Sequence, residues 1–425
     1  MATEKLAILG GKPVIEKQDE ALFHWPIVND AMREASTAVL NEGVMSGTDR
    51  ARKFEDGFAK WQGRQYALSF PSGTSAITTA FFTLGVGPGD EVICPSFTYW
   101  ASCLGAQTLG AKVILCDCEP ETMQMDPAAF EAAITPRTKV VVAVHLSACP
   151  YDMDRIMDIA NRHHIAVLED VSHAQGGHYK GKRVGNFGQV AAMSLMSGKS
   201  FAIGEGGMLV TDDYEIYRKA IRFGHYDRIP QVFSMEEIKD TKNMPFGAMK
   251  NRLNQCAAAV GIEQLKKYDA ERAEIEKAML YYWKQLEGVP GFRIMWPKDE
   301  GSDKAGWYAS RCHYDPEAFG GLSNVTFAKA VSAETQGGYT PGCYMPLHYS
   351  SLFGKQGPFP VTERMNQLIV SDPWFKHCDT AKIDLYAAAV RKVAAQWEAL
   401  LPLDEGVPPC DGGLGLTDFE KKKRV

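Results

Sequence analysis

The chain has 425 residues, of which 45% are hydrophobic and 23% charged, and its formal net charge is -6. A chain of this length is too long for one small core, so we expect two domains. The composition is that of an ordinary globular protein, and the negative charge argues against nucleic acid or an anionic membrane as a partner. No apolar run approaches the roughly 20 residues that cross a bilayer.

The cysteines suggest a reducing compartment. None of the ten forms a Cys-X-X-Cys pair, and the spacing of Cys116 and Cys118 suits neither a zinc site nor a disulfide framework. We therefore expect reduced thiols, no bound metal and a cytoplasmic protein. The first residues, Met1-Ala-Thr-Glu-Lys5, also lack the apolar core of a signal peptide.

The first elements are an irregular arm and two helices. Residues 1–30 contain Gly10-Gly-Lys-Pro13 and Trp25-Pro26, which predict irregular backbone. Apolar residues at helical spacing then predict helices at Asp30–Glu42 and Arg50–Gln62, the first capped by Asn29 or Asp30.

From residue 64 onward, strands alternate with helices. The expected strands are Gln65–Phe70, Glu91–Pro95, Lys112–Asp117, Lys139–Leu146, Ile165–Asp170, Val190–Met196 and Met208–Thr211. The expected helices are Thr74–Leu84, Tyr99–Leu109, Pro127–Ile134 and Asp152–His163. Short strands rich in Val, Ile and Leu and separated by helices predict an α/β fold, with a mostly parallel seven-stranded sheet between helices.

The remaining chain has fewer clear patterns. Residues 226–246 show no clear periodicity, whereas helical spacing predicts helices at Asn251–Tyr268 and Ala270–Leu286 and a last one at Ala381–Leu401. The segment from Pro402 onward is rich in Pro and Gly and is expected to be loose. We thus expect an N-terminal arm at residues 1–30, a large domain at 31–268 and a smaller α+β domain at 269–425.

Polar residues gather where the expected strands end. Ligands bind at the carboxyl ends of parallel strands, and this is where Ser72-Gly73-Thr74, Ser96 to Tyr99, Asp170 and Lys199 fall. Gly73 lets the backbone approach an anion, and the following helix offers free N–H groups, so this junction suits a phosphate. The same residues would also suit simple helix capping.

Three of these residues suggest cofactor chemistry. Lys199 stands between two strands among small residues, where burial would lower its pKa and let the amine form a Schiff base; a surface-loop lysine is the alternative. Asp170 would keep the ring nitrogen of pyridoxal 5′-phosphate (PLP) protonated, or would serve as a helix cap or metal ligand. Tyr99 would stack on a flat ring or pack in the core.

Along the chain, the expected phosphate site comes first and is followed by Tyr99, Asp170 and Lys199. In the order of these features the chain resembles the DegT/DnrJ/StrS family of PLP-dependent sugar aminotransferases, which have the aspartate aminotransferase fold type I. The resemblance extends from about Gly10 to the last expected helix. The matching segments are Ser72–Ala76, Gly85–Val92, Pro95–Tyr99, Val144–Leu146, Asp152–Asp154, Glu169–Asp170, Lys180–Gly185, Gly204–Gly207, Asn251–Leu253 and Pro346–His348.

The resemblance implies a role for each matching residue. Lys199 would form the Schiff base and move a proton between substrate and cofactor, while Asp170 would pair with the pyridine nitrogen. Tyr99 would stack on the ring. The phosphate would be bound by Gly73, Thr74 and Ser194.

Two positions depart from the common family pattern. His173 stands where many members have Gln, as it does in the aminohydroxybenzoate synthases of the same family, and would hydrogen-bond the ring hydroxyl. Lys250 takes the place of an Asn that reaches the phosphate of the neighbouring subunit. A cation there would also suit a phosphate, which implies a homodimer with active sites at the subunit interface; the alternative is a solvent-facing lysine.

The resemblance implies amino transfer from glutamate or glutamine to a keto sugar, often nucleotide-linked, or to a keto cyclitol, by a ping-pong mechanism. Such a reaction would serve the biosynthesis of an amino sugar, an aminocyclitol natural product such as an antibiotic, or a cell-surface glycan. Candidate substrate contacts, with loop packing as the alternative, are His225, Tyr226 and His348.

Two other functions stay open at this point. One is a PLP-dependent dehydratase or aromatising synthase of the same family. Lys199 argues against the dehydratases, which carry His at that position, whereas His173 favours a synthase similar to the aminohydroxybenzoate synthases. The other is a non-catalytic PLP-binding regulator, against which the joint presence of Lys199, Asp170 and the phosphate cradle argues.

Overall fold

A seven-stranded sheet forms the centre of the computed structural model, which describes residues 4–239 and 249–408. Its strands are β1 (Tyr66–Phe70), β2 (Glu91–Pro95), β3 (Lys112–Cys116), β4 (Thr138–Val144), β5 (Ala166–Asp170), β8 (Val190–Ser194) and β9 (Gly207–Thr211). The order across the sheet is β1-β9-β8-β5-β4-β2-β3, and β9 alone among these seven runs in the direction opposite to the other six. The seven expected strands and the mostly parallel sheet are confirmed, and each strand lies within two residues of its expected bounds.

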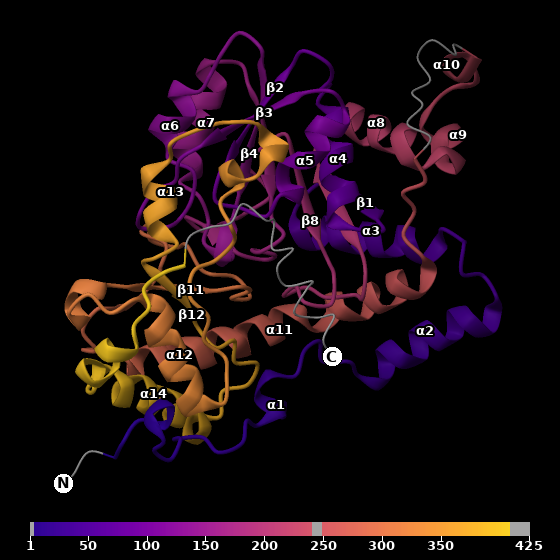
Figure 1. Cartoon of the computed structure of the whole chain (residues 1–425). Helices are drawn as coiled ribbons and strands as arrows, with labels where there is room; N and C mark the ends of the chain where they lie inside the picture. The colour runs from indigo at the N-terminus through magenta and orange to yellow at the C-terminus, as the bar shows by residue number, and fades with distance from the viewer. Residues whose placement is uncertain (1–3, 240–248, 409–425) are drawn as a thin grey trace.

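Helices cover both faces of this sheet and continue into the rest of the chain (Figure 1). They are α1 (Glu20–Phe23), α2 (Asp30–Glu42), α3 (Asp49–Gln62), α4 (Gly73–Thr83), α5 (Ala101–Thr108), α6 (Pro127–Ala132), α7 (Met153–Arg162), α8 (Tyr214–Gly224), α9 (Ile229–Val232), α10 (Met235–Lys239), α11 (Gln255–Gln285), α12 (Asn324–Thr335), α13 (Pro360–Met365) and α14 (Thr380–Ala394). None of the helices in the described ranges has an apolar stretch long enough to cross a lipid bilayer.

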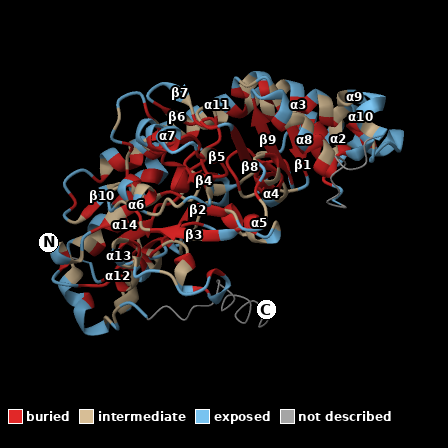
Figure 2. Ribbon diagram, turned by 90° about the horizontal axis from the view of Figure 1, so that it is seen from above, coloured by how far each residue is buried: buried red, intermediate tan, exposed pale blue. Residues whose placement is uncertain are grey.

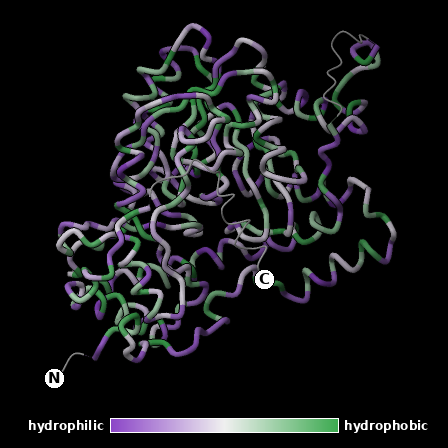
Figure 3. Tube along the Cα trace, viewed as in Figure 1, coloured by the Kyte–Doolittle hydropathy of each residue, from purple (hydrophilic) through white to green (hydrophobic). Residues whose placement is uncertain are grey.

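Each face of the large sheet has its own apolar core, because neighbouring side chains of a strand point to opposite faces. Val141 and Val167 lie on one face, which is covered by α3, α6, α7 and the beginning of α11. Val142 and Leu168 lie on the other, which is covered by α4, α5 and α8. Figure 2 shows the strands buried between these helices, and Figure 3 shows their apolar character. Sandwiched in this way, the sheet exposes mainly its strand ends to ligands.

Three of the helical expectations need correction. One continuous helix, α11, replaces the two expected on either side of Asp269, because no Gly or Pro interrupts the backbone ladder there and because α11 packs on α2, α3 and α14. α8 was not expected, although Asp213 caps it and its apolar residues face the sheet. The expected last helix is shorter, because α14 ends at Ala394 and is followed by a separate 3₁₀ segment, η8 (Trp397–Leu403).

Part of the chain without clear periodicity also forms short helices. η3 (Tyr226–Arg228), α9 and α10 occupy residues 226–239. The rest of that stretch, residues 240–248, and most of the segment expected to be loose, residues 409–425, lie outside the described residues.

A second, antiparallel sheet belongs to the C-terminal part of the chain. It consists of β10 (Phe292–Ile294), β11 (Arg311–Tyr314) and β12 (Ile369–Ser371), and its apolar core includes residues of α11, α12 and α14. Leu6, Ile15 and Leu22 from the expected arm belong to the same core, so the arm is anchored against the second sheet. A short hairpin of β6 (His178–Tyr179) and β7 (Lys182–Arg183) follows β5.

Candidate active site

Lys199 lies in the loop between β8 and β9 and is only 8% exposed. Its Nζ atom is 4.3 Å from the centre of the Tyr308 ring. Burial lowers the pKa of the amine to about 8, although the negative charge of Asp170 acts in the opposite direction. A sizeable share of this amine is therefore neutral near physiological pH, which is the state that attacks a carbonyl carbon.

Two hydrogen bonds hold the backbone of Lys199. Its N–H donates to the carbonyl oxygen of Met196 (2.9 Å), and its carbonyl oxygen accepts the indole N–H of Trp25 (2.8 Å). Trp25 belongs to the N-terminal arm and is 174 residues away in the chain. No local pattern pairs the two residues, so sequence reasoning missed this contact.

Asp170 ends β5 as a buried carboxylate, 3% exposed. Oδ2 accepts the hydroxyl of Ser102 (2.7 Å), and Oδ1 accepts the backbone N–H of Ser172 (3.0 Å). Both donors are neutral, and no Lys, Arg or His of the described ranges forms an ion pair with Asp170. A buried carboxylate without a cation is costly, and a protonated pyridine nitrogen would supply the missing charge.

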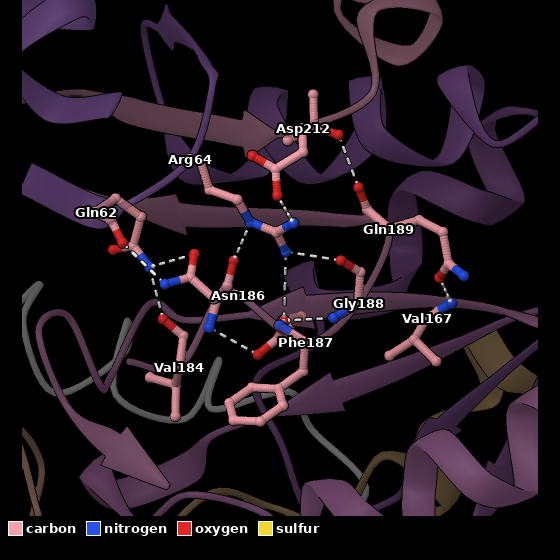
Figure 4. A network of polar contacts seen from close by, with 12 residues as sticks. Gln62, Arg64, Val167, Val184, Asn186, Phe187, Gly188, Gln189 and Asp212 are labelled. Atoms are coloured by element: carbon pink, nitrogen blue, oxygen red, sulfur yellow. Dashed lines mark hydrogen bonds and ion pairs between the residues drawn. The ribbon is translucent and has the colours of Figure 1, made fainter. Parts of the chain in front are cut away.

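The neighbouring acid, Glu169, has a different task because strand alternation turns it to the other face of the sheet. Its carboxylate accepts the backbone N–H groups of Gly185 (2.6 Å) and Gly188 (2.7 Å). Burial tends to raise the pKa of Glu169, but His145 and these N–H groups outweigh it and lower the pKa. Arg64 holds the same loop by donating to the carbonyl oxygens of Gly185 and Gly188 (Figure 4). Glu169 thus anchors the loop between β7 and β8, which leaves Asp170 for the site.

The beginning of α4 forms a close junction with the ends of β8 and β9. Ser72 caps the helix, its hydroxyl accepting the N–H of Ser75 (3.1 Å). A Cβ on Gly73 would lie 2.6 Å from Cα and Cβ of Ser194, and one on Gly207 would lie 2.3 Å from the carbonyl oxygen of Ser72. Only glycine permits this approach. The first turn, including the exposed Thr74, keeps free N–H groups beside Ser194, which suits a phosphate.

His173 is buried and neutral at this site. Its Nδ1 accepts the backbone N–H of Ser147 (3.2 Å), and its Nε2 lies 3.4 Å from the hydroxyl of Tyr344. Burial, with the positive charges of Lys199 and Arg311, holds the pKa of the imidazole well below its usual value. Since Nδ1 accepts, the single proton is on Nε2, which is therefore a donor. Ser147 has a positive φ of 54°, a strained backbone of the kind found at functional sites.

Tyr99 follows β2 and is 44% exposed, so its ring is available for stacking. Its centre lies 5.7 Å from that of Tyr344. Tyr308 and Ser102, which contact Lys199 and Asp170, were not expected from the sequence. The position of Ser102, three residues after Tyr99 in the first turn of α5, could have suggested that it lies near the site. Tyr308 lies between β10 and β11, and no sequence pattern links it to Lys199.

Two expected substrate contacts are turned into the fold instead. Nε2 of His225 donates to the carbonyl oxygen of Ser69 in β1 (2.9 Å), and burial lowers the pKa of His225 to about 4. His348 lies between the hydroxyl of Ser96 (2.7 Å) and the carboxylate of Glu363 (3.2 Å). Because both imidazoles already have partners within the protein, their placement does not support a contact with substrate.

Two further expected site residues lie at the surface. Tyr226 is 53% exposed in η3, and Lys250 is exposed shortly before α11. The roles given to them stay predictions. In the described part of the chain, no group of three or more His, Cys, Asp or Glu side chains is arranged to hold a metal ion.

The residues of the site fit PLP in three respects. Lys199 provides a buried amine with a lowered pKa, and Asp170 provides a buried carboxylate that forms no ion pair within the described residues. The first turn of α4 lies close against Ser194, which only a glycine at position 73 permits. These would hold the aldehyde, the ring nitrogen and the phosphate of the cofactor, respectively.

Comparison with known proteins agrees with this geometry. The model of the DegT/DnrJ/EryC1/StrS aminotransferase family matches residues 26–391. The chain is 29% identical to the spore coat polysaccharide biosynthesis protein SpsC of Bacillus subtilis, with coverage of 89% of this chain and 99% of that protein. It is 30% identical to an L-glutamine:2-deoxy-scyllo-inosose aminotransferase of Streptoalloteichus tenebrarius, with coverage of 91% and 97%. Its fold is similar to that of a 3-amino-5-hydroxybenzoic acid synthase, with a TM-score of 0.75, 27% identity and coverage of 88% and 98%.

The family match extends over β5, which carries Asp170, over the loop that carries Lys199 and over the beginning of α4. It also includes the second sheet and most of α14. The arrangement of Lys199, Asp170 and the beginning of α4 fits PLP, and the family match over most of the chain agrees with it. The chain belongs to the DegT/DnrJ/EryC1/StrS aminotransferase family and is a PLP-dependent aminotransferase.

Proposed function

We propose that this enzyme moves an amino group from glutamate or glutamine to the ketone of a sugar, often a nucleotide-linked one, or of a cyclitol. The observation that carries the proposal is the combination of Lys199, whose pKa is lowered to about 8, with the buried carboxylate of Asp170, which forms no ion pair within the described residues. The similarity to a glutamine-dependent cyclitol aminotransferase and to a polysaccharide biosynthesis protein supports this range of donors and acceptors.

The protein's own residues divide the work. When bound, PLP supplies an electrophilic carbon that reacts with amines and a ring that accepts electrons. Nζ of Lys199 is placed to take the proton from the α-carbon of the donor. The Asp170 carboxylate would hold the ring nitrogen of the bound cofactor, and Nε2 of His173 would be a donor for its ring hydroxyl. The first turn of α4 and Ser194 would hold its phosphate.

Amino transfer requires the donor to leave as a 2-oxo acid before the ketone binds, and the same residues then act in reverse. Initial rates with both substrates varied are therefore expected to give parallel lines in double-reciprocal plots, and intersecting lines would contradict the mechanism. The proposal includes a cytoplasmic homodimer in which Lys250 of one subunit reaches the phosphate site of the other. The exposure of Lys250 supports this arrangement.

An aromatising synthase is the second candidate function. Two observations favour it, namely the buried His173, whose Nε2 is a donor, and the similarity to a 3-amino-5-hydroxybenzoic acid synthase. Product analysis separates the two functions. Loss of water without formation of a 2-oxo acid would favour the synthase, and formation of a 2-oxo acid with transfer of nitrogen would favour the aminotransferase.

The proposed function is tested through Lys199. Replacing it (Lys199→Ala) should abolish turnover and the absorption band of the covalently bound cofactor, because no other amine lies over the Tyr308 ring in the described residues. The same change at the exposed Lys219 (Lys219→Ala) should leave both unchanged. Turnover that survives in Lys199→Ala would refute the assignment.

Absorption spectra of the wild-type enzyme would then identify the amino donor and the acceptor. Glutamate or glutamine should convert it to its pyridoxamine form, and the keto sugar or cyclitol that restores the original spectrum is the acceptor. If neither amino acid converts the enzyme, the proposed donors are wrong.

A further inference from the structure

Gln175 follows β5 and has a fully buried amide that makes three hydrogen bonds. Nε2 donates to the carbonyl oxygens of Ser172 (3.1 Å) and Ser194 (2.7 Å). Oε1 accepts the hydroxyl of Ser200 (2.7 Å). Because Nε2 lies between two carbonyl oxygens, which need a donor, the orientation of the amide is fixed. One side chain therefore joins three points of the chain.

Each of these three serines leads to a group that would contact the cofactor. The N–H of Ser172 donates to Oδ1 of Asp170 (3.0 Å), and Ser200 directly follows Lys199. Ser194 lies beside the first turn of α4, and its N–H donates to the hydroxyl of Ser172 (3.0 Å). The groups that would hold the ring nitrogen, the aldehyde and the phosphate are thus connected through a single amide.

Tyr268 of α11 supports this amide. Its hydroxyl donates to the backbone carbonyl oxygen of Gln175 (2.7 Å) and lies 3.0 Å from the hydroxyl of Ser200. Burial raises the pKa of Tyr268, so the hydroxyl stays protonated at neutral pH. The three side chains are all fully buried. Hydrogen bonds between buried groups are costly to break, because each broken bond leaves a polar atom unpaired.

Gln62 serves as a contrast, because it is buried to a similar degree in another part of the fold. Its Nε2 donates to the carbonyl oxygen of Val184 (2.7 Å), and its carbonyl oxygen accepts the side-chain N–H of Asn186 (2.8 Å), both in the loop before β8 (Figure 4). Its Oε1 has no hydrogen-bond partner within the described residues. Both glutamines are buried and both hold a backbone carbonyl, but of the two only Gln175 connects the groups of the cofactor site.

We propose that Gln175 is a positioning residue, whose amide holds Asp170, Ser194 and Lys199 at the spacing that PLP requires before the cofactor binds. Without the amide, the carbonyl oxygens of Ser172 and Ser194 lose their donor, and the segments that carry the three groups are free to separate. Binding of PLP must then restore the arrangement, which lowers the affinity. The inference goes beyond the proposed function, because it concerns cofactor binding and does not depend on the amino donor or the acceptor.

The test replaces the amide in two ways. Gln175→Met has a similar length but no donor, whereas Gln175→Glu keeps the shape and donates one hydrogen bond only while its carboxyl group is protonated. Gln62→Met and Gln62→Glu are the matched controls. Equilibrium dialysis of each holoenzyme against PLP gives the dissociation constant from pH ~5 to ~9. Thermal unfolding reports whether each variant is folded.

Gln175→Met is expected to bind PLP roughly 10- to 100-fold more weakly than the wild type at every pH, because two buried carbonyl oxygens lose their donor. Gln175→Glu should bind PLP nearly as well as the wild type at low pH, where the new carboxyl group is neutral and donates. As the pH rises through the pKa of this group, the ratio of the dissociation constant to that of the wild type should increase, because a carboxylate then faces two carbonyl oxygens.

Taking this ratio at each pH removes the pH dependence that Lys199 itself gives to PLP binding. Both Gln62 variants should keep the wild-type affinity for PLP at every pH, even where they unfold at a lower temperature. A role of Gln175 in stability alone would lower the unfolding temperature in the same way and would leave the affinity ratio at one.

Two results would overturn the inference, namely an unchanged PLP affinity in Gln175→Met or an equal loss of affinity in Gln62→Met. If Gln175→Met does not fold, Gln175→Glu decides, and an affinity ratio that stays constant with pH would overturn the inference as well. Failure of the proposed function looks different. A wild type that binds PLP but takes no amino group from glutamate or glutamine refutes that function and leaves the PLP measurements on Gln175 valid.

Discussion

At the scale of single residues, the amine of Lys199 is governed by two opposing effects. Burial favours the neutral form and lowers the pKa to about 8, whereas the negative charge of Asp170 favours the ammonium form. Asp170 itself has only neutral donors, Ser102 and Ser172. The charge of Asp170 therefore opposes the effect of burial on the pKa of Lys199, and the balance between these two effects should be visible in the pH dependence of the amine.

Asp170→Asn is predicted to lower the pKa of Lys199 further. Only the neutral amine attacks, so the rate at which the cofactor-free enzyme binds PLP covalently should rise as the pH increases through about 8. Asn removes the charge that raises the pKa of Lys199, so the rise should occur at lower pH in the variant. Rapid-mixing absorbance measurements across this range would show the shift. The matched change at the exposed Asp56 (Asp56→Asn) should leave the midpoint in place, and an unshifted midpoint in Asp170→Asn would contradict the assignment.

At the scale of elements, the phosphate cradle depends on how closely α4 approaches β8. The helix begins at Gly73, and the backbone of Ser194 occupies the space that a Cβ on that residue would need. The cradle is therefore a property of the junction between the two elements and is not contained in either one.

Gly73→Ala is predicted to force α4 away from β8. The added Cβ would lie 2.6 Å from Ser194, so the free energy of unfolding should fall by about 1–3 kcal/mol and the affinity for PLP should fall with it. Gly87→Ala is the control, because no atom lies within 4 Å of its Cβ, and it should change stability by less than about 1 kcal/mol. Denaturant unfolding and PLP titration measure both effects. Equal behaviour of the two variants would show that the close approach does not matter.

At the scale of the whole molecule, the N-terminal arm connects the two sheets. Leu6, Ile15 and Leu22 pack in the core of the second sheet, yet Trp25 of the same arm donates to the carbonyl oxygen of Lys199. α11 makes a second connection, because it packs on α2 and α3 at one end and on α14 at the other (Figure 1). The position of the catalytic loop therefore depends on how both parts of the chain are joined.

Trp25→Phe is predicted to loosen the catalytic loop without removing the ring. Loss of the hydrogen bond to Lys199, worth about 0.5–1.5 kcal/mol, should lower kcat by roughly 2- to 10-fold while the KM for the amino donor changes little. Trp296→Phe removes an indole N–H that donates no hydrogen bond to a described residue, and it should leave kcat unchanged. Steady-state kinetics of the two variants provide the comparison. A lowered kcat in both, or in neither, would argue against a role for the arm.

The amino-acid sequence by itself determined the large sheet and the place of its chemistry. All seven strands of the sheet, and the positions of Asp170 and Lys199 at or beyond strand ends, follow from local patterns, because short runs of Val, Ile and Leu between helices depend only on neighbours in the chain. The continuous α11 and the unexpected α8 depart from these patterns, since packing on other elements decided them.

Only the tertiary structure decided what surrounds Lys199. Trp25 and Tyr308 come from distant parts of the chain and meet at Lys199 because the arm and the second sheet pack against the large one. The same packing gives the imidazoles of His225 and His348 hydrogen-bond partners within the protein. Local sequence patterns describe a residue and its neighbours along the chain, whereas the environment of a buried group is set by whichever distant side chains the folded layers bring beside it.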